Sequence, residues 1–200
     1  MSTTNHLDDR QFKALITLLD DDDPEVHEHV WSALLAMGNS GLERLEAAWE
    51  IQENPLIQQR LEEVIHLIHL TEVGKDLLTW RKGGGRDLLK GWYLLSRFQF
   101  PDLEFRKYRN EINRLVNKSW LQMNDRMDAQ QKLKVINHII FRMEGYGPNK
   151  NKNNFPNNTF LNYLVDQQQG NAVSLAALYL IICQQLDLPV HGVILPGYFI

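Results

Sequence analysis

A repeated helix start constrains the first third of this chain more than any other sequence feature. The segments Asp23–Val26 (DPEV) and Asn54–Ile57 (NPLI) lie 31 positions apart. In both, Asp or Asn can cap free backbone N–H groups, and a proline follows at the first helical position, where no donor is needed. The apolar residues that follow recur with helical spacing and align between the two copies. They pair as Val26 with Ile57, Val30 with Leu61, Leu34 with Ile65 and Met37 with Ile68.

Each of these helices is preceded by a shorter apolar segment. Residues 1–70 are therefore predicted to form two helical hairpins, which resemble HEAT-type repeats. Two copies are fewer than the three that usually form a stable array, so we expect them to pack against the region that follows. The preceding segments carry Phe12, Leu15, Leu18 and Leu19 in the first copy and Leu42, Leu45, Ala48 and Trp49 in the second.

The middle region, residues 71–127, remains helical but does not repeat. Gly83–Gly85 interrupts the pattern, and with Arg86 it is typical of a linker, since a phosphate-binding loop would continue with Lys-Ser or Lys-Thr. Asp128 followed by Gln131 predicts a capping box that opens the last region. The tryptophans are expected to anchor the core. Apolar stripes mark a helix on each side of this start: Ile112, Leu115, Val116 and Trp120 before it, and Leu133, Ile136, Ile139, Ile140 and Met143 after it.

The stretch 145–158 (GYGPNKNKNNFPNN) is the one conspicuous loop in the sequence. Gly, Pro and Asn interrupt regular structure, so no packed element is expected there, and Lys150 and Lys152 are expected to be solvated. After the loop the pattern predicts a short helix at 159–168, an apolar helix at 171–186 and a strand at 189–195.

Composition excludes several classes of function. The net charge of −4 argues against a nucleic-acid-binding protein, which needs a basic surface to neutralise phosphates. No apolar segment reaches the roughly 20 residues of a membrane span, and the N-terminus lacks the basic and apolar regions of a signal peptide. A single cysteine, Cys183, excludes an internal disulfide and a multi-cysteine zinc site. We therefore expect a cytoplasmic protein with neither a membrane nor a nucleic-acid partner.

The C-terminal region carries four short motifs in a fixed order: N-T-F-L-N at 158–162, Q-G-N-A-V-S-L at 169–175, L-D-L-P-V at 186–190 and L-P-G-Y-F at 195–199. Together they resemble the bacterial transglutaminase-like family of SirB type, in which a HEAT-like helical region precedes a papain-like core. The resemblance implies a predominantly helical α+β fold. It would comprise HEAT-like hairpins at 1–70, a helical middle at 71–127, and the opening helix and strand of a papain/transglutaminase-like core at 128–200.

The same resemblance implies a cysteine nucleophile, a histidine base and an acidic residue. The position that matches the cysteine is Ala172, the position that matches the histidine is Tyr198, and the acidic residue would lie beyond Ile200. A methyl group cannot attack a carbonyl, and a phenol with a pKa of about 10 is a poor base at neutral pH. We expect the chain to be a fragment of a longer protein, because a single terminal strand would leave backbone groups unpaired.

Four other side chains are candidates for chemistry in this region. Ser174, near the helix start, is a candidate nucleophile, although serine there is more often a cap. His191 is a candidate base that could line a cleft, whereas His138, among apolar helix positions, is interpreted as a core histidine. Cys183 has apolar neighbours and is predicted to be a buried structural thiol.

Carboxylates and histidines also gather near the N-terminus, at Asp20–Asp23 with His27 and His29. Their spacing matches no calcium loop, and acidic residues before a helix are explained by capping and the helix dipole. His66 and His69 share a helix face but have no third ligand nearby. The sequence therefore predicts neither a metal site nor a cofactor.

These observations lead to one functional hypothesis and two alternatives. The hypothesis is a non-catalytic transglutaminase-like protein that binds an unidentified protein or peptide through the vestigial cleft or the helical repeats. The first alternative is an active peptidase, amidase or acyl-transferase that uses Ser174, His191 or Tyr198 in altered roles. The second is a helical scaffold, in which the C-terminal region only completes the core.

Overall fold

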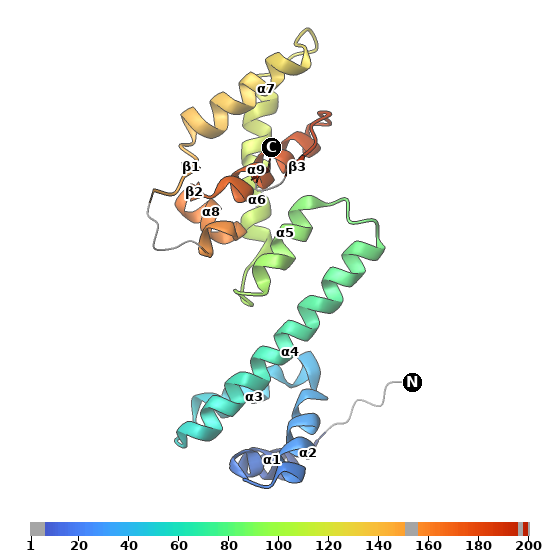
Figure 1. The fold of residues 1–200 in the computed structure, drawn as a ribbon, viewed down its shortest axis with the longest axis vertical. Helices are drawn as coiled ribbons and strands as arrows, with labels where there is room; N and C mark the ends of the chain where they lie inside the picture. The colour runs from blue at the N-terminus through green and yellow to red at the C-terminus, as the bar shows by residue number, and fades with distance from the viewer. Residues whose placement is uncertain (1–6, 151–155, 196–197, 200) are drawn as a thin grey trace. The chain divides into compact units, whose positions relative to one another are not determined.

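The computed structural model describes the backbone of residues 7–150, 156–195 and 198–199, with side chains up to Val193. The chain divides into two compact units, Met1–Asp76 and Leu77–Ile200. Both are built mainly from helices (Figure 1). Each described strand is two residues long. The predominantly helical α+β fold expected from the sequence is confirmed.

Both helix starts predicted in the first unit are confirmed. Asp23 Oδ1 accepts a hydrogen bond from the Glu25 N–H at 2.9 Å, and Asn54 Oδ1 accepts one from the Leu56 N–H at 3.0 Å. The kinship of these hairpins with HEAT-type repeats stays a prediction. The elements of the unit are α1 (Asp9–Thr17), the 3-10 turn η1 (Leu18–Asp20), α2 (Pro24–Leu35), the 3-10 turn η2 (Gly38–Gly41), α3 (Leu42–Glu50) and most of α4 (Pro55–Lys82).

One core fills the first unit, because the aligned apolar stripes of α2 and α4 face the side chains of the two shorter helices. The single helix α4 runs past residue 70, so the second repeat has no break at the predicted boundary. Burial of such stripes is what stabilises helices of this length in water. The buried side chains of this core are Phe12, Ile16, Leu19, Val30, Leu34, Leu42, Leu45, Ile57, Leu61, Val64 and Ile68.

The second unit surrounds α9 (Ala172–Gln185), a helix that is apolar on nearly every side. Such a helix must be buried, and α9 packs against α5 (Leu88–Arg97), α6 (Phe105–Leu121) and α8 (Leu161–Gln167) (Figure 1). Its bounds agree with the apolar helix predicted at 171–186. The other elements are α5 (Leu88–Arg97), α6 (Phe105–Leu121), α7 (Ala129–Asn137), η3 (His138–Met143), β1 (Gly147–Pro148), η5 (Asn157–Thr159), α8 (Leu161–Gln167), β2 (Gln169–Gly170), β3 (Ile194–Leu195) and β4 (Tyr198–Phe199).

Helix α7 begins with the predicted capping box. Gln131 N–H donates to Asp128 Oδ1 at 2.8 Å, and Asp128 N–H donates to Gln131 Oε1 at 2.9 Å. The helix then widens into the π-helix η3 at His138. His138 is exposed, so its interpretation as a core histidine was wrong. Ile136, Ile139 and Ile140 occupy the inward face, and residue 138 lies on the other side of the helix.

Helix α6 corrects a second expectation. Ile112 and Leu115 are fully buried, but Trp120 is 65% exposed and does not anchor the core. Five residues at about 100° each carry Trp120 well away from the direction of Leu115. Ser119, four residues after Leu115, takes the buried position and donates its hydroxyl to the Leu115 carbonyl at 2.9 Å.

A cluster of charges joins α6 to the end of the π-helix. The Arg114 guanidinium donates to both carboxylate oxygens of Glu144, at 3.0 and 2.6 Å, and to both oxygens of Glu111, at 2.9 and 2.6 Å. Lys118 pairs with Glu144 as well. The Glu144 side chain is only 9% exposed. Its hydrogen bonds with Arg114, with Lys118 adding to them, hold the pKa of Glu144 at about 2.

Two expectations about the C-terminal region were wrong. The loop at 145–158 contributes strand β1, which pairs in parallel with β2, and its Tyr146 and Asn158 are buried. The strand expected at 189–195 is confined to β3, which pairs antiparallel with β4 rather than standing alone. In both places, pairing with a nearby segment satisfies backbone groups that isolated residues would leave free. Lys152 lies outside the described residues.

No helix of the described residues is both long and apolar enough to cross a bilayer. Within the same residues, His, Cys, Asp and Glu side chains do not gather in groups of three or more that could hold a metal ion. In the acidic segment, Asp23 caps α2 and Asp20 accepts a hydrogen bond from Asn54 Nδ2 at 3.0 Å. His27 stacks on Trp31 with 5.4 Å between ring centroids, and His69 Nε2 lies 3.8 Å from a Glu46 oxygen.

Candidate functional site

Helix α9 begins at the position where the resemblance implies a nucleophile. Asn171 caps this helix, because its Oδ1 accepts a hydrogen bond from the Ser174 N–H at 2.9 Å. In return, Ser174 Oγ accepts one from the Asn171 N–H at 3.0 Å, which completes a capping box. Thr159 Oγ1 accepts from Asn171 Nδ2 at 2.8 Å, so a neighbouring turn fixes the capping side chain.

The side chains exposed at this helix start are hydrocarbon. Ala172 is exposed and Val173 is 52% exposed. Ser174 is completely buried, and its hydroxyl also lies 3.2 Å from the Asn171 carbonyl, to which it can donate. A thiol at position 172 would lie at the positive end of the helix dipole, which favours a thiolate. Alanine provides no such group, and the buried hydroxyl at position 174 is held in the cap.

The other candidate residues lie elsewhere. Cys183 is fully buried near the far end of α9, and burial raises the pKa of its thiol to about 11, which agrees with a structural thiol. His191 is exposed and lines a shallow hollow of about 680 Å³ with Leu188 and Pro189. Tyr198 lies in β4, which runs beside α9, and its side chain is outside the described set.

Hydrogen bonds of Asn149 and Asn158 connect the segment 145–158 to the residues that precede α9. Asn149 N–H donates to the Gly170 carbonyl at 2.9 Å, and Asn149 Nδ2 donates to Asn158 Oδ1 at 2.7 Å. Asn158 is only 4% exposed. Gly170 packs so tightly that a methyl there would overlap Ser174 Oγ and come within 2.6 Å of Leu164 Cδ1. The inner side of the α9 start is therefore tightly packed.

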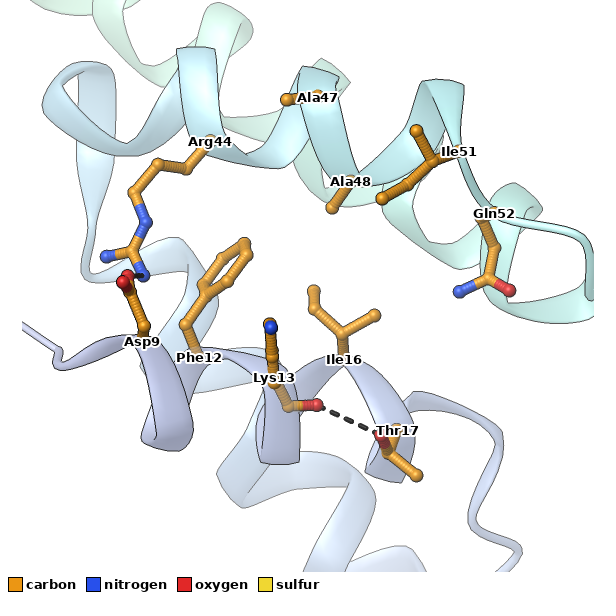
Figure 2. Close-up of a pocket in the computed structure, with 10 residues that line it drawn as sticks. All are labelled: Asp9, Phe12, Lys13, Ile16, Thr17, Arg44, Ala47, Ala48, Ile51 and Gln52. Carbon is orange, nitrogen blue, oxygen red and sulfur yellow. Dashed lines mark hydrogen bonds and ion pairs between the residues drawn. The ribbon is translucent and has the colours of Figure 1, made fainter.

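The first unit holds an apolar groove between α1 and α3, with a volume of about 590 Å³. Figure 2 shows Phe12 and Ile16 on α1 facing Ala48 and Ile51 on the α3 side. Phe12 and Ile16 are almost buried at its base, whereas Ile51, just after the end of α3, is 82% exposed. Ile51 therefore adds an exposed apolar side chain to the rim of the groove.

Charged groups define one end of this groove. The Arg44 guanidinium lies 4.3 Å above the Phe12 ring and pairs with Asp9 Oδ1 at 2.8 Å (Figure 2). Arg44 also donates to the Leu7 carbonyl at 3.0 Å. Its guanidinium group therefore already has partners within the first unit. Lys13 is exposed on the wall of the groove, and no carboxylate of the described residues lies within 4.0 Å of it.

Most of the second unit matches a known protein family in sequence. The profile of the transglutaminase-like superfamily matches residues 106–200, from the start of α6 onward. These residues therefore form a transglutaminase-like domain.

Two curated relatives are UPF0162 proteins from Xylella fastidiosa, of strains Temecula1 and 9a5c. Each is 27% identical to this chain over 107 residues, which cover 54% of the chain and 38% of the relative. The chain thus matches well under half the length of these relatives. No solved structure gives a significant match.

The sequence predicted Phe12 and Ala48 only as core residues and gave no indication of a groove. Ile51, an apolar side chain at its rim, follows the end of α3 and lies outside the apolar stripe of that helix. An apolar side chain outside a buried stripe is the signal that could have found it. Lys13 carried no such signal, because a charged residue on an amphipathic helix is ordinary.

A cysteine placed at position 172 tests the geometry of the α9 start. Ala172→Cys is expected to yield a thiol whose pKa lies below the usual value of about 8.5, because the helix dipole stabilises a thiolate there. Gln185→Cys, exposed at the opposite end of the same helix, is the matched control and should show a pKa at or above the usual value. Alkylation rates measured against pH check this, with buried Cys183 as a slow background. Equal pKa values for the two thiols would contradict the described helix start.

Proposed function

We propose that this chain is a non-catalytic protein of the SirB-type branch, which binds a protein or peptide segment through the groove between α1 and α3. The single observation that supports the loss of catalysis is the exposed methyl group of Ala172 at the start of α9. A cysteine-type acyl transfer needs a thiolate at that point, and the first turn offers none.

The groove supports the binding role by its shape and chemistry. Its base is apolar, one end is occupied by the Asp9–Arg44 pair, and its wall carries the exposed ammonium group of Lys13. An apolar anchor would fill the space beside Ile51 and displace water from both surfaces. A carboxylate of the same segment would pair with Lys13. The expected partner is therefore a segment with an apolar anchor next to an acidic residue.

An active enzyme with unusual residues would need an accessible nucleophile. Ser174 is completely buried and Cys183 is buried with a raised pKa, so neither favours that alternative. Incubating the purified chain with a glutamine-containing peptide and a primary amine tests it directly. We expect no ammonia release and no crosslinked product. Turnover that disappears in Ser174→Ala would establish the enzyme instead, provided that the variant keeps its thermal unfolding temperature.

Binding is tested with peptides selected on the immobilised chain from a random library. Enriched peptides are expected to carry an apolar anchor beside an acidic residue and to bind Ile51→Asp at least tenfold more weakly, because the variant places a carboxylate in the apolar groove. Leu121→Asp is the matched control, since Leu121 is also an exposed apolar residue, at 73%, but lies in the second unit. Calorimetric titration compares the affinities. No enrichment, or an equal loss in both variants, would refute binding at this groove.

A further inference from the structure

A second hollow, of about 520 Å³, lies in the second unit and is lined mainly by polar groups. Three separate segments build it: the turn before α5, one face of α6 and the end of α9. Arg86 comes from the turn, Arg109 and Asn113 from α6, and Gln184 and Gln185 from α9. Buried Leu89 and the ring of Phe105 provide its apolar part.

The two arginines of this hollow lack the partners that other charged residues of the unit have. Within the described part of the chain, neither Arg86 nor Arg109 has a carboxylate oxygen within 4.0 Å or a side-chain hydrogen bond, whereas Arg114 binds two carboxylates. Both are exposed, and guanidinium groups bind carboxylate and phosphate groups with two parallel hydrogen bonds. Two such groups lining one hollow favour an anionic ligand.

The backbone beneath Arg86 is held rigidly. Gln184 Nε2 donates to the Arg86 carbonyl at 2.6 Å, and Gln184 Oε1 accepts from the Leu88 N–H at 3.3 Å. Trp80 Nε1 donates to the Asp87 carbonyl at 2.8 Å. These three hydrogen bonds fix the backbone from which the Arg86 side chain extends. Less conformational entropy is then lost when Arg86 binds a ligand.

The carboxylate of Asp87 also lines the hollow and would repel an anion. Its Oδ1 accepts the Lys90 N–H at 2.9 Å as the cap of α5, so it is engaged with the helix start. Against this one carboxylate, the hollow has the guanidinium groups of Arg86 and Arg109. Cations therefore outnumber the carboxylate.

We propose that this hollow binds the phosphate or carboxylate group of a small molecule between Arg86 and Arg109. Asn113 and Gln185 supply further amide donors, and the Phe105 ring provides a surface for an apolar part of the ligand. The site is independent of the groove in the first unit and of the start of α9.

The test is a titration with inorganic phosphate and, separately, with succinate, at constant ionic strength in chloride. The backbone amide signals of Leu88, Lys90 and Asn113 are followed by NMR. At least one anion is expected to give saturable shifts, and the tighter of the two identifies the ligand class. Absence of saturation with both would overturn the proposal.

Arginine variants distinguish a specific anion site from general electrostatic attraction of anions to the protein. Arg109→Ala and Arg86→Ala are each expected to weaken binding about tenfold, since each removes a charge-assisted pair of hydrogen bonds. Arg106→Ala removes the same charge from an exposed position on the same helix and should change affinity less than twofold. Arg109→Lys keeps the positive charge but cannot form two parallel hydrogen bonds. Its affinity for the anion should lie between those of Arg106→Ala and Arg109→Ala. Equal weakening by Arg106→Ala and Arg109→Ala would refute the site, and unchanged thermal unfolding checks that each variant is folded.

Discussion

Replacement of Gly170 by alanine is expected to lower the free energy of unfolding of the second unit by about 2 kcal/mol. The added methyl would overlap Ser174 Oγ and approach Leu164 Cδ1 to 2.6 Å. Neither neighbour can move easily, because Ser174 is held in the α9 cap and Leu164 is completely buried. Urea unfolding followed by circular dichroism measures the change.

Gly147 is the matched control for this substitution. It lies in β1, paired with the strand that contains Gly170, and a methyl built on it meets no atom within 4 Å. Gly147→Ala is expected to leave stability unchanged or to raise it by up to about 1 kcal/mol, because alanine has less freedom than glycine in the unfolded chain. Equal destabilisation by both substitutions would show that the packing described at the α9 start is wrong.

The second large expected effect is a loss of folding stability at acidic pH. Arg114, with Lys118, holds the pKa of Glu144 at about 2, against an ordinary value of 4.5. A carboxylate whose pKa is lower in the folded state stabilises the protein fully above its unfolded pKa and loses that contribution as pH falls toward its folded pKa. The difference corresponds to about 3 kcal/mol. This contribution is therefore present at pH 7 and is lost between about pH 5 and pH 2.

Glu144→Gln isolates this contribution. At pH 7 the variant is expected to be about 2–3 kcal/mol less stable than the wild type, and the two should converge as pH approaches 2. Asp125→Asn is the control, since Asp125 is exposed and forms no ion pair with the other described residues. Its stability should follow the wild-type curve. The measurement is denaturant unfolding at a series of pH values, and a Glu144→Gln difference that stays constant with pH would contradict the proposed linkage.

Local chemistry in the sequence was sufficient to locate the helix starts. Asp23 and Asn54 before prolines, and Asp128 before Gln131, place side-chain acceptors within reach of free N–H groups in the next turn. Such contacts span only a few residues, so the sequence contains all their partners. The apolar period of α9 likewise predicted a buried helix and a buried Cys183, because a helix without a polar face has no side to turn toward water.

The predictions were wrong where burial depends on which side of a helix faces the core, or on pairing with a strand far along the chain. His138 and Trp120 belong to predominantly apolar patterns, yet neighbouring residues on the same helices occupy the inward positions. The segment 145–158 looked irregular because the partner of β1 lies after α8, 22 positions further along the chain for both pairs, Gly147–Gln169 and Pro148–Gly170. Local propensity holds no information about such a partner.

By itself, the sequence determined the helix caps, the apolar stripes and the methyl group of Ala172 at the start of an apolar helix. All of these depend on residues within a few positions of one another. Only the tertiary structure decided that Ser174 is completely buried, that Ile51 borders a groove, and that Arg86 and Arg109 line one hollow. These features need segments far apart in the chain to meet, and packing of the core brings them together.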